Sequence, residues 1–169
     1  MLKVDLGLLS RQHRVRIETD VPAEDPLWEP LPWAFDGPVS LDLDIQQAGE
    51  DVVVRGRVRG TAALSCRRCL TPVVQELDED LTFVYRAGIA DVEAQAEEVY
   101  VLPPRASELD LAGAIYEHVL LAVPQFVNCD EACRGFCPRC GTNLNTSSCD
   151  CVAADEDPRW AALRRLRSE

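Results

Sequence analysis

The chain has 169 residues, of which 47% are hydrophobic, and its formal net charge is −12. This length suits one domain, or one domain with an appendage, and the apolar content is sufficient for a core. The apolar run at residues 119–123 is far too short to cross a bilayer, and the first residues do not resemble a secretory signal. We therefore expect a cytoplasmic protein with no membrane partner.

The negative charge is concentrated in the middle of the chain. Residues 71–130 contain 12 acidic and 2 basic residues, whereas residues 1–70 contain 11 and 9, and residues 131–169 contain 6 and 6. A uniformly acidic chain would be repelled by nucleic acid, but here the two ends are nearly neutral and carry arginines. The middle therefore suits a basic protein partner, while nucleic acid could meet the ends.

Alternating hydrophobic residues predict strands at the N-terminus. Val4, Leu6 and Leu8 alternate with other residues, which predicts a first strand with one buried face, and residues 11–18 continue it. Residues 20–38 contain five prolines and two tryptophans. That composition is typical of a surface loop whose indole rings cover apolar ground.

A β-hairpin follows, and its register can be predicted. Two runs of alternating apolar and polar residues are joined by Gly49 and Glu50, which suit a two-residue type II′ turn. This turn pairs Ile45 with Val54, so that the apolar residues of both strands lie on one face.

The other face of this hairpin carries a row of arginines, which has two interpretations. The predicted register places Asp44 opposite Arg55 and Asp42 opposite Arg57, and in one interpretation these aspartates neutralise the two arginines. In the other interpretation the row contacts phosphates. Three arginines have no obvious partner in the sequence, and these are Arg59, Arg67 and Arg68.

The remaining elements are further strands and two helices. Residues 73–85 and 98–102 are predicted strands, separated by an acidic loop at 88–97. A helix is predicted at 108–123. Its cap is Ser107, its end is Pro124, and its buried stripe consists of Leu111, Ile115, Val119 and Ala122.

A second helix is predicted at the C-terminus, where Pro158 suits a first helical turn. Its basic residues are Arg164, Arg165 and Arg167, which could dock on the body or contact RNA. We therefore predict an α+β fold, with a curved, mainly antiparallel sheet or a small open barrel and one packed helix. Residues 1–126 form this body, including the loop-rich part at 20–38. Residues 127–151 form a zinc-bound appendage, and residues 152–169 a basic helix.

Eight cysteines give the chain its strongest chemical signal. Paired cysteines separated by a short polar loop are typical of zinc sites, and the reducing cytosol disfavours disulfides. A tetrahedral zinc ion takes four ligands, so eight cysteines allow two structural sites. The preferred partition groups Cys137, Cys140, Cys149 and Cys151 in one site and Cys66, Cys69, Cys129 and Cys133 in the other.

Two other arrangements remain open. One groups Cys129 and Cys133 with Cys137 and Cys140, and leaves Cys66, Cys69, Cys149 and Cys151 for a second zinc. The other has a single zinc and spare thiols. In each of them a four-cysteine site leaves no position for water or substrate, so the zinc is structural. The sequence contains no nucleophile elbow, phosphate-binding glycine loop or histidine-and-carboxylate metal triad, and we predict that it is not an enzyme.

Several of these motifs together resemble the YceD family of bacterial and plastid proteins. They are CRRCL at 66–70, the helix AIYEHVLLAVP, the run CRGFCPRCGTNLN with CDC, and DPRWAALRRL. The resemblance extends from about Val39 to the C-terminus. In this family, members without the last cysteine cluster keep the CxxC of the sheet and metal-ligand residues after the helix, which favours the first partition.

The resemblance also implies a function. The family is associated with accumulation of large-subunit ribosomal RNA, which implies a ribosome-assembly factor that binds a basic large-subunit ribosomal protein, the precursor large subunit or its RNA. The acidic candidates for contact are Glu76, Asp78, Glu79 and Asp80, and the basic ones are Arg59, Arg67, Arg68, Arg164, Arg165 and Arg167. The alternative is a regulatory protein that responds to zinc or to thiol oxidation, because arginines beside the cysteines could lower a thiol pKa.

Overall fold

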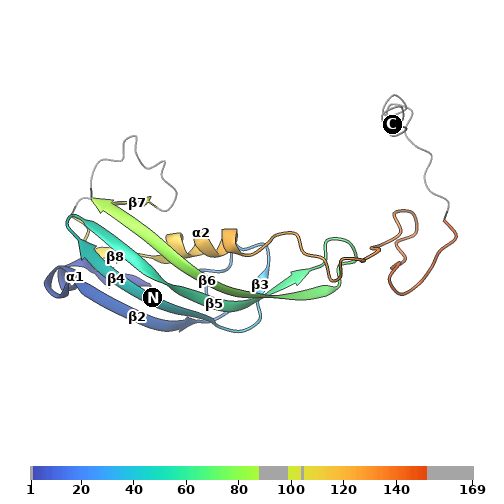
Figure 1. Cartoon of the computed structure of the whole chain (residues 1–169), viewed down its shortest axis with the longest axis horizontal. Helices are drawn as coiled ribbons and strands as arrows, with labels where there is room; N and C mark the ends of the chain where they lie inside the picture. The colour runs from blue at the N-terminus through green and yellow to red at the C-terminus, as the bar shows by residue number, and fades with distance from the viewer. Residues whose placement is uncertain (1, 88–98, 104, 152–169) are drawn as a thin grey trace, which may run out of the picture.

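The computed structural model describes residues 2–87, 99–103 and 105–151, which form an elongated α+β molecule (Figure 1). Its elements in chain order are β1 (Lys3–Asp5), α1 (Leu6–Gln12), β2 (Arg14–Val21), β3 (Ala34–Phe35), β4 (Val39–Ala48), β5 (Asp51–Ser65), β6 (Pro72–Ala87), β7 (Val99–Leu102), β8 (Glu108–Asp110) and α2 (Ala112–Ala122).

Most strands belong to one open, six-stranded sheet. The order is β2-β4-β5-β6-β7, and β3 pairs with β5 beside this path. All neighbours are antiparallel except β6 and β7, which are parallel. The predicted α+β class with a mainly antiparallel sheet is therefore confirmed. The described residues contain two helices in the body rather than the one expected.

The predicted hairpin between β4 and β5 is confirmed. Ile45 pairs with Val54, and Ala48 pairs with Asp51 on either side of the turn. Gly49 has a φ of 68°, a left-handed conformation that glycine adopts without steric cost. Apolar side chains of both strands lie on the same face, where Leu43, Ile45 and Val54 have no exposed surface.

Helix α2 covers this apolar face of the sheet. Ile115 and Val119 of α2 are completely buried. The ring of His118 lies edge-on to that of Phe83 on β6, at 5.8 Å between centroids. Burying such side chains removes apolar surface from water, which is the main source of stability for a two-layer arrangement.

Two predictions about element boundaries were wrong. The first strand does not continue through Leu6 and Leu8, because Asp5 Oδ1 accepts a hydrogen bond from Leu8 N (2.6 Å) and caps the short helix α1. The helix predicted from residue 108 begins at Ala112, since residues 108–110 instead pair with β1. Asp110, expected inside the helix, accepts a hydrogen bond from Ala112 N (2.9 Å).

The loop predicted at 20–38 is shorter in the structure, because residues 20–21 end β2 and residues 34–35 form β3, but its indole rings pack on the body as predicted. Trp28 is 4% exposed, and the rings of Trp28 and Trp33 both lie edge-on to Phe35 of β3, at 5.1 Å. The acidic loop predicted at 88–97 and the helix predicted at 152–169, with Arg164, Arg165 and Arg167, lie outside the described residues. Within the described part of the chain, no helix is long and apolar enough to cross a membrane.

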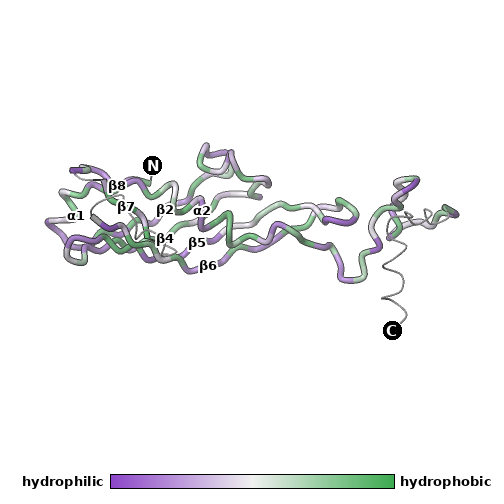
Figure 2. Tube along the Cα trace, turned by 90° about the horizontal axis from the view of Figure 1, so that it is seen from above, coloured by the Kyte–Doolittle hydropathy of each residue, from purple (hydrophilic) through white to green (hydrophobic). Residues whose placement is uncertain are grey.

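The hairpin of β5 and β6 extends beyond β4, and there β3 pairs with it only at Ala62 and Ala63. Strand β4 pairs with β5 only as far as Arg59, whereas β6 accompanies β5 to Ser65. Figure 2 shows this extension as a narrow arm that leads from the sheet to the cysteine-rich segment. The arm thus places its tip, residues 66–71, beside the chain that leaves α2.

Candidate metal centres

The first cysteine group joins the tip of the β5–β6 arm to the chain after α2. Cys66 and Cys69 lie in the turn between the strands, and Cys129 and Cys133 come from the segment after α2. The Sγ atoms of Cys69 and Cys129 are 3.4 Å apart, and those of Cys66 and Cys133 are 3.8 Å apart. All four sulfurs lie within 4.8 Å of one another. We call this group site 1.

The second group is local in sequence. Cys137, Cys140, Cys149 and Cys151 also place their sulfurs within 4.8 Å of one another. We call this group site 2. The structure thus brings the eight cysteines together as in the preferred partition, and the alternative that joins Cys129 to Cys140 is not the arrangement found.

The two sites differ in exposure. In site 1, Cys66, Cys69 and Cys133 are buried and only Cys129 is exposed. In site 2, Cys137 is buried, Cys149 is intermediate, and Cys140 and Cys151 are exposed. A solute in water can therefore reach site 2 more directly than site 1.

Both CxxC pairs form the same turn. The sequences CRRCLT and CPRCGT share the pattern C-x-R-C-x-T. In the first, Leu70 N donates to Cys66 O (2.9 Å) and Cys66 N donates to Thr71 O (2.9 Å). In the second, the equivalent bonds join Gly141 to Cys137 (2.9 Å) and Cys137 to Thr142 (2.8 Å). The repeated geometry follows from the repeated residues.

The threonine of each turn is a site residue that our sequence analysis missed. Thr71 Oγ1 lies 3.2 Å from Cys69 Sγ, and Thr142 Oγ1 lies 3.2 Å from Cys140 Sγ. A hydroxyl at this distance can donate to a thiolate and stabilise its charge. The signal was present in the sequence as the shared threonine two positions after each CxxC.

The surroundings lower the pKa of the two CxxC cysteines in each site, which favours their thiolate form, whereas contacts with these cysteines raise the pKa of Cys129, Cys149 and Cys151. At Cys66, burial raises the pKa, but the backbone amides of Cys129, Arg68 and Cys69 outweigh it and lower the pKa to about 6. At Cys140, hydrogen bonds from the side chain and backbone of Thr142 lower the pKa to about 6. Thiolate is the form of cysteine that binds a metal ion.

The donor sets fit a tetrahedral zinc ion. Zn–S bonds of about 2.3 Å in a tetrahedron place the sulfurs about 3.8 Å apart, and the two distances in site 1 lie close to this value. A second layer of donors is also present, since Asn145 Nδ2 lies 3.4 Å from Cys133 Sγ and Arg68 N lies 3.4 Å from Cys66 Sγ. Such outer contacts orient ligands and tune a metal site.

Arg67 and Arg68 connect the parts of site 1 to each other. Arg67 Nε donates to Asn128 Oδ1 (3.2 Å), and its backbone N donates to Val127 O (2.9 Å). Arg68 Nη1 donates to Cys133 O (2.7 Å). The expectation that these arginines lack partners was therefore wrong. Their partners lie in the segment after α2, which is distant in sequence and meets the tip of the arm only in the folded chain.

The arginine row of the sheet is also largely paired, but with different acids from those predicted. Asp42 and Asp44 bind Arg16 and Arg14 of the neighbouring strand β2. Arg57 donates instead to Asp78 of β6, with Nε 2.5 Å from Oδ1. β4 lies between two arginine-bearing strands, and its aspartates meet the arginines of β2 rather than those of β5.

Arg59, expected to be unpaired, shares the same carboxylate of Asp78, at 3.2 Å. The other predicted acidic contacts are exposed on β6, with Glu76 and Asp80 on the face of Asp78 and Glu79 on the opposite face. The structure therefore gathers the acidic candidates along one strand, apart from the cysteine sites at the end of the arm.

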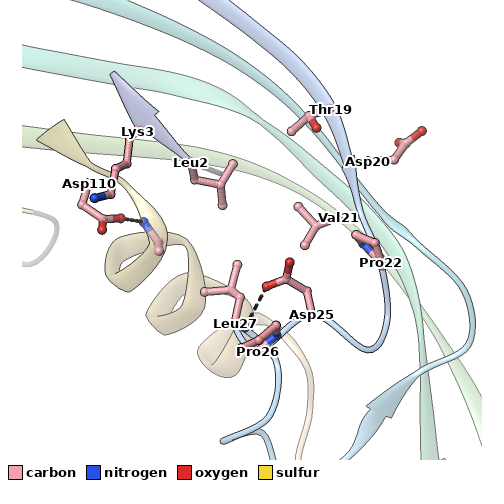
Figure 3. Close-up of a pocket in the computed structure, with 11 residues that line it drawn as sticks. Leu2, Lys3, Thr19, Asp20, Val21, Pro22, Asp25, Pro26, Leu27 and Asp110 are labelled. Carbon is pink, nitrogen blue, oxygen red and sulfur yellow. Dashed lines mark hydrogen bonds between the residues drawn. The ribbon is translucent and has the colours of Figure 1, made fainter. Parts of the chain in front are cut away.

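The described residues also contain a cavity of about 400 Å³ near the start of α2 (Figure 3). Lys3, Asp25 and Asp110 are among the residues that line it. Asp25 Oδ1 accepts from Leu27 N and Asp110 Oδ1 accepts from Ala112 N, both at 2.9 Å. Both carboxylates thus stabilise turns of the backbone, which is a structural role.

Comparison with known proteins identifies similar chains. A family described as large ribosomal RNA subunit accumulation protein YceD matches residues 54–167. A relative from Arabidopsis thaliana, named large ribosomal RNA subunit accumulation protein YCED homolog 1, chloroplastic, is 28% identical over 158 residues, which cover 78% of this chain and 49% of the relative. An uncharacterised protein of Mycobacterium tuberculosis is 33% identical over 127 residues, covering 74% of this chain and 60% of the relative.

The homologue of the same name from Zea mays is 26% identical over 142 residues, covering 68% of this chain and 48% of the relative. The chain thus spans about half to three fifths of the length of these relatives. No solved structure matches the chain.

Proposed function

The chain belongs to the YceD family, and we propose on this basis that it supports the accumulation of large-subunit ribosomal RNA as a non-catalytic assembly factor. The observation that carries the proposal is the match over residues 54–167, which include both cysteine sites and the acidic strand β6. The names of the family and of its plant relatives both refer to this accumulation. We place this activity in the cytoplasm, where thiols stay reduced.

We further propose that each cysteine site holds one structural zinc ion. Four sulfurs in each site are close enough for shared coordination, and site 1 approaches tetrahedral spacing. With all four ligands supplied by the protein, the ion would have no open position for a reacting water. At site 1 the ion would hold the segment after α2 against the tip of the arm, and at site 2 it would order residues 137–151.

The charge distribution supports a protein partner with the opposite charge. Glu76, Glu79 and Asp80 are exposed on β6, and a strongly basic ribosomal protein could be held there before it reaches RNA. Arg67 and Arg68 are engaged in the contacts around site 1. Direct RNA contact by the terminal Arg164, Arg165 and Arg167 is the second contact mode that we propose.

Depletion of the protein tests the assembly role. We expect large-subunit ribosomal RNA to fall relative to small-subunit RNA, and the protein to sediment with precursor large subunits at low salt. Binding between opposite charges weakens with salt, because charges are screened beyond about 10 Å at 0.1 M ionic strength. Unchanged large-subunit RNA after depletion, together with no sedimentation with precursors, would contradict the proposal.

Charge reversal separates the two contact modes. Changing Glu76, Glu79 and Asp80 to lysine should weaken a basic protein partner and leave RNA contact intact or stronger. Asp78 is left unchanged, because it holds Arg57 and Arg59. Changing Arg164, Arg165 and Arg167 to glutamate should have the opposite effect on the two contacts. If neither set alters any association, charge is not the basis of recognition.

The exposure of site 2 favours one alternative function, regulation by thiol oxidation or zinc release. Cys140 and Cys151 are exposed, and the pKa of Cys140 is lowered by its contacts with Thr142. A peroxide would convert two such thiols to a disulfide and water, with release of zinc. This alternative requires that mild oxidation changes association with ribosomal precursors. A protein that associates equally well before and after oxidation of site 2 is not regulated in this way.

A further inference from the structure

Strand β6 has a long edge that no described strand covers. On one side β5 pairs with residues 72–85. On the other side β7 pairs only with residues 84–87, so the edge at residues 72–83 has no neighbouring strand in the described structure. In Figure 1, β7 lies beside only the arrowhead end of β6. Unpaired backbone N–H and C=O groups along such an edge form a template for another strand.

The turn at Gly49 determines which residues present these groups. In a two-residue hairpin, Ala48 and Asp51 exchange hydrogen bonds, and bonded and non-bonded pairs then alternate along the ladder. The backbone N–H and C=O groups of even-numbered residues of β5 therefore bond to β6, and those of odd-numbered residues point away from β6. This alternation agrees with Asp36 N donating to Thr61 O (2.7 Å) on the side of β5 away from β6.

The same alternation applied to β6 gives the outward groups. Odd-numbered residues of β6 bond to β5, because they are paired with even-numbered residues of β5. The backbone groups of the even-numbered residues then point to the open edge. These residues are Val74, Glu76, Asp78, Asp80 and Thr82. Among their outward groups, Glu76 O accepts from the exposed side chain of Gln75 (Nε2, 3.1 Å), a bond that an added strand would replace.

The side chains beside this edge are acidic. Residues 72–85 include Glu76, Asp78, Glu79 and Asp80 and no basic residue. The side chain of Asp80 is 84% exposed, and its nearest basic atom in the described structure, Arg57 Nη1, is 3.9 Å away. Glu76 is exposed as well, and only Asp78 is shared by two arginines. Two of the three acidic side chains on the outer face are thus available to a ligand.

We propose that the open edge of β6 binds an extended, basic polypeptide segment as an additional strand of the sheet. Main-chain hydrogen bonds to the even-numbered residues would provide affinity, and lysine or arginine at every second position would face Glu76 and Asp80. The proposal rests on the proposed function, since it describes how the protein partner would be held.

The acidic side chains also select against other occupants. Pairing of two β6 edges from two copies of the chain would place acidic side chains opposite each other, which is unfavourable. RNA would bring phosphates toward the same carboxylates. A basic strand is the occupant for which both the backbone and the side chains are complementary.

A peptide of alternating lysine and threonine, twelve residues long, provides the probe. We expect it to bind the full chain in titration calorimetry at low salt, with backbone amides of Glu76, Asp78 and Asp80 gaining protection from hydrogen exchange. Two variants separate charge from backbone. D80N removes the charge, whereas D80P removes the same charge and also blocks the outward N–H. D80P should bind the peptide about tenfold more weakly than D80N.

Glu18→Pro, on the outer edge of β2, is the matched control for a proline on an edge strand, and it should bind the peptide as the unaltered protein does. Circular dichroism and zinc content establish that each variant is folded. Equal affinities of D80N and D80P, with both folded, overturn the proposal.

A second experiment leaves the protein unchanged, and it therefore tests strand addition at the β6 edge even if D80P does not fold. Two peptides carry N-methyl groups, one on alternate lysines and the other on alternate threonines. Only one edge of the peptide can face β6, so one of the two should lose binding and the other keep it. In an antiparallel strand the lysines opposite Glu76 and Asp80 would themselves donate to β6, so methylation of lysine blocks binding. In a parallel strand the threonines on either side would donate, so methylation of threonine blocks binding. Equal effects, or none, overturn the proposal.

These outcomes are separate from those of the proposed function. Loss of large-subunit RNA on depletion, combined with no strand addition in either experiment, contradicts only the binding mode. Strand addition without any change in large-subunit RNA contradicts the assembly role and leaves the binding edge in place.

Discussion

Sites 1 and 2 are built on the same turn but are attached to the protein in different ways. Site 1 joins two segments that are far apart in sequence, and three of its cysteines are buried. The four cysteines of site 2 all lie within residues 137–151, and two of them are exposed. The same CxxC turn can therefore either connect distant segments of the tertiary structure or order a short local segment.

The two turns also differ at the residue after the second cysteine. Leu70 and Gly141 both have positive φ values, 56° and 71°. This conformation costs a residue with a side chain about 1–2 kcal/mol and glycine very little. The side chain of Leu70 is also 66% exposed. Site 1 therefore retains a strained residue, which agrees with its firmer attachment by tertiary contacts.

Removal of ligands should give the largest difference between the sites. We expect Cys66→Ser with Cys69→Ser to separate residues 125–151 from the arm and to lower the thermal unfolding midpoint strongly. Structural zinc binding contributes on the order of 10 kcal/mol, comparable to the stability of a whole domain. Cys137→Ser with Cys140→Ser should leave the midpoint of the body nearly unchanged. Similar losses in the two double variants would show that the sites are equally integrated.

Chelation should reveal the next largest difference. We expect two zinc ions per chain in protein purified without chelator, and release in two phases when a chelator is added. The faster phase should come from site 2, because its sulfurs are exposed. Measurement with a colorimetric zinc indicator on the two double variants assigns each phase. A single phase in the full chain, or faster release from site 1, would contradict this assignment.

A pair of glycines gives a smaller, local effect. A Cβ on Gly135 would lie 2.9 Å from Arg68 O, and Gly135 has a φ of 71°. Gly135→Ala should therefore cost about 2–4 kcal/mol, from the clash and the backbone strain together. Gly141→Ala meets nothing within 4 Å and should cost only about 1 kcal/mol.

Chemical denaturation of the two glycine variants measures this difference. The hydrogen bond from Phe136 N to Arg68 O (3.2 Å), directly after Gly135, holds the start of the site 2 segment against the turn of site 1. Gly135→Ala should also speed zinc release from site 1, whereas Gly141→Ala should not. The reverse order of costs would show that the segment repacks around the added methyl group.

The smallest expected effect concerns the charged face of the sheet and pH. The hydrogen bond from Arg57 lowers the pKa of Asp78, although burial raises it slightly. Because the folded-state pKa is depressed, this contribution is present above the unfolded pKa of about 3.9 and is lost as pH falls through the folded value. Arg57→Ala should raise the pKa of Asp78 and reduce the stability difference between neutral and acidic pH.

Carboxyl titration by NMR measures the pKa, and Arg55→Ala is the control on the same strand. Zinc release in acid would affect stability as well, so the comparison is between the variant and the unaltered protein at each pH. The stability effect should be small, because the pair is exposed to solvent. No change in the Asp78 titration would contradict the role given to Arg57.

The hairpin was predictable because local chemistry determines it. The turn at Gly49 and the alternation of apolar residues in both strands allow only one register, which pairs Ile45 with Val54, and the structure has this pairing. The grouping of Cys66 with Cys133 was one of several that spacing allowed. It needed the arm that carries Cys66 to the end of α2, which is a tertiary feature.

The other errors came from contacts between distant segments. The apolar alternation of Val4, Leu6 and Leu8 predicted a strand, but the cap at Asp5 and the pairing of β1 with β8 turned the chain into a helix. The ion pairs of Asp42 and Asp44 with β2 required knowledge of which strand lies beside β4. Sequence spacing does not contain the order of strands in a sheet.

The pairing of β1 with β8 has a consequence for the order in which the chain folds during synthesis. Val4 pairs with Leu109, and Leu111 N donates to Leu2 O (2.9 Å) just before α2 begins. The ladder of β2, β4, β5 and β6 is complete in the sequence before residue 109 leaves the ribosome. The first strand must therefore wait unpaired, with the apolar side chains of Leu2 and Val4 beside it and in it, while most of the sheet forms. Leu2 and Val4, which are buried in the folded chain, therefore lack their cover during that interval.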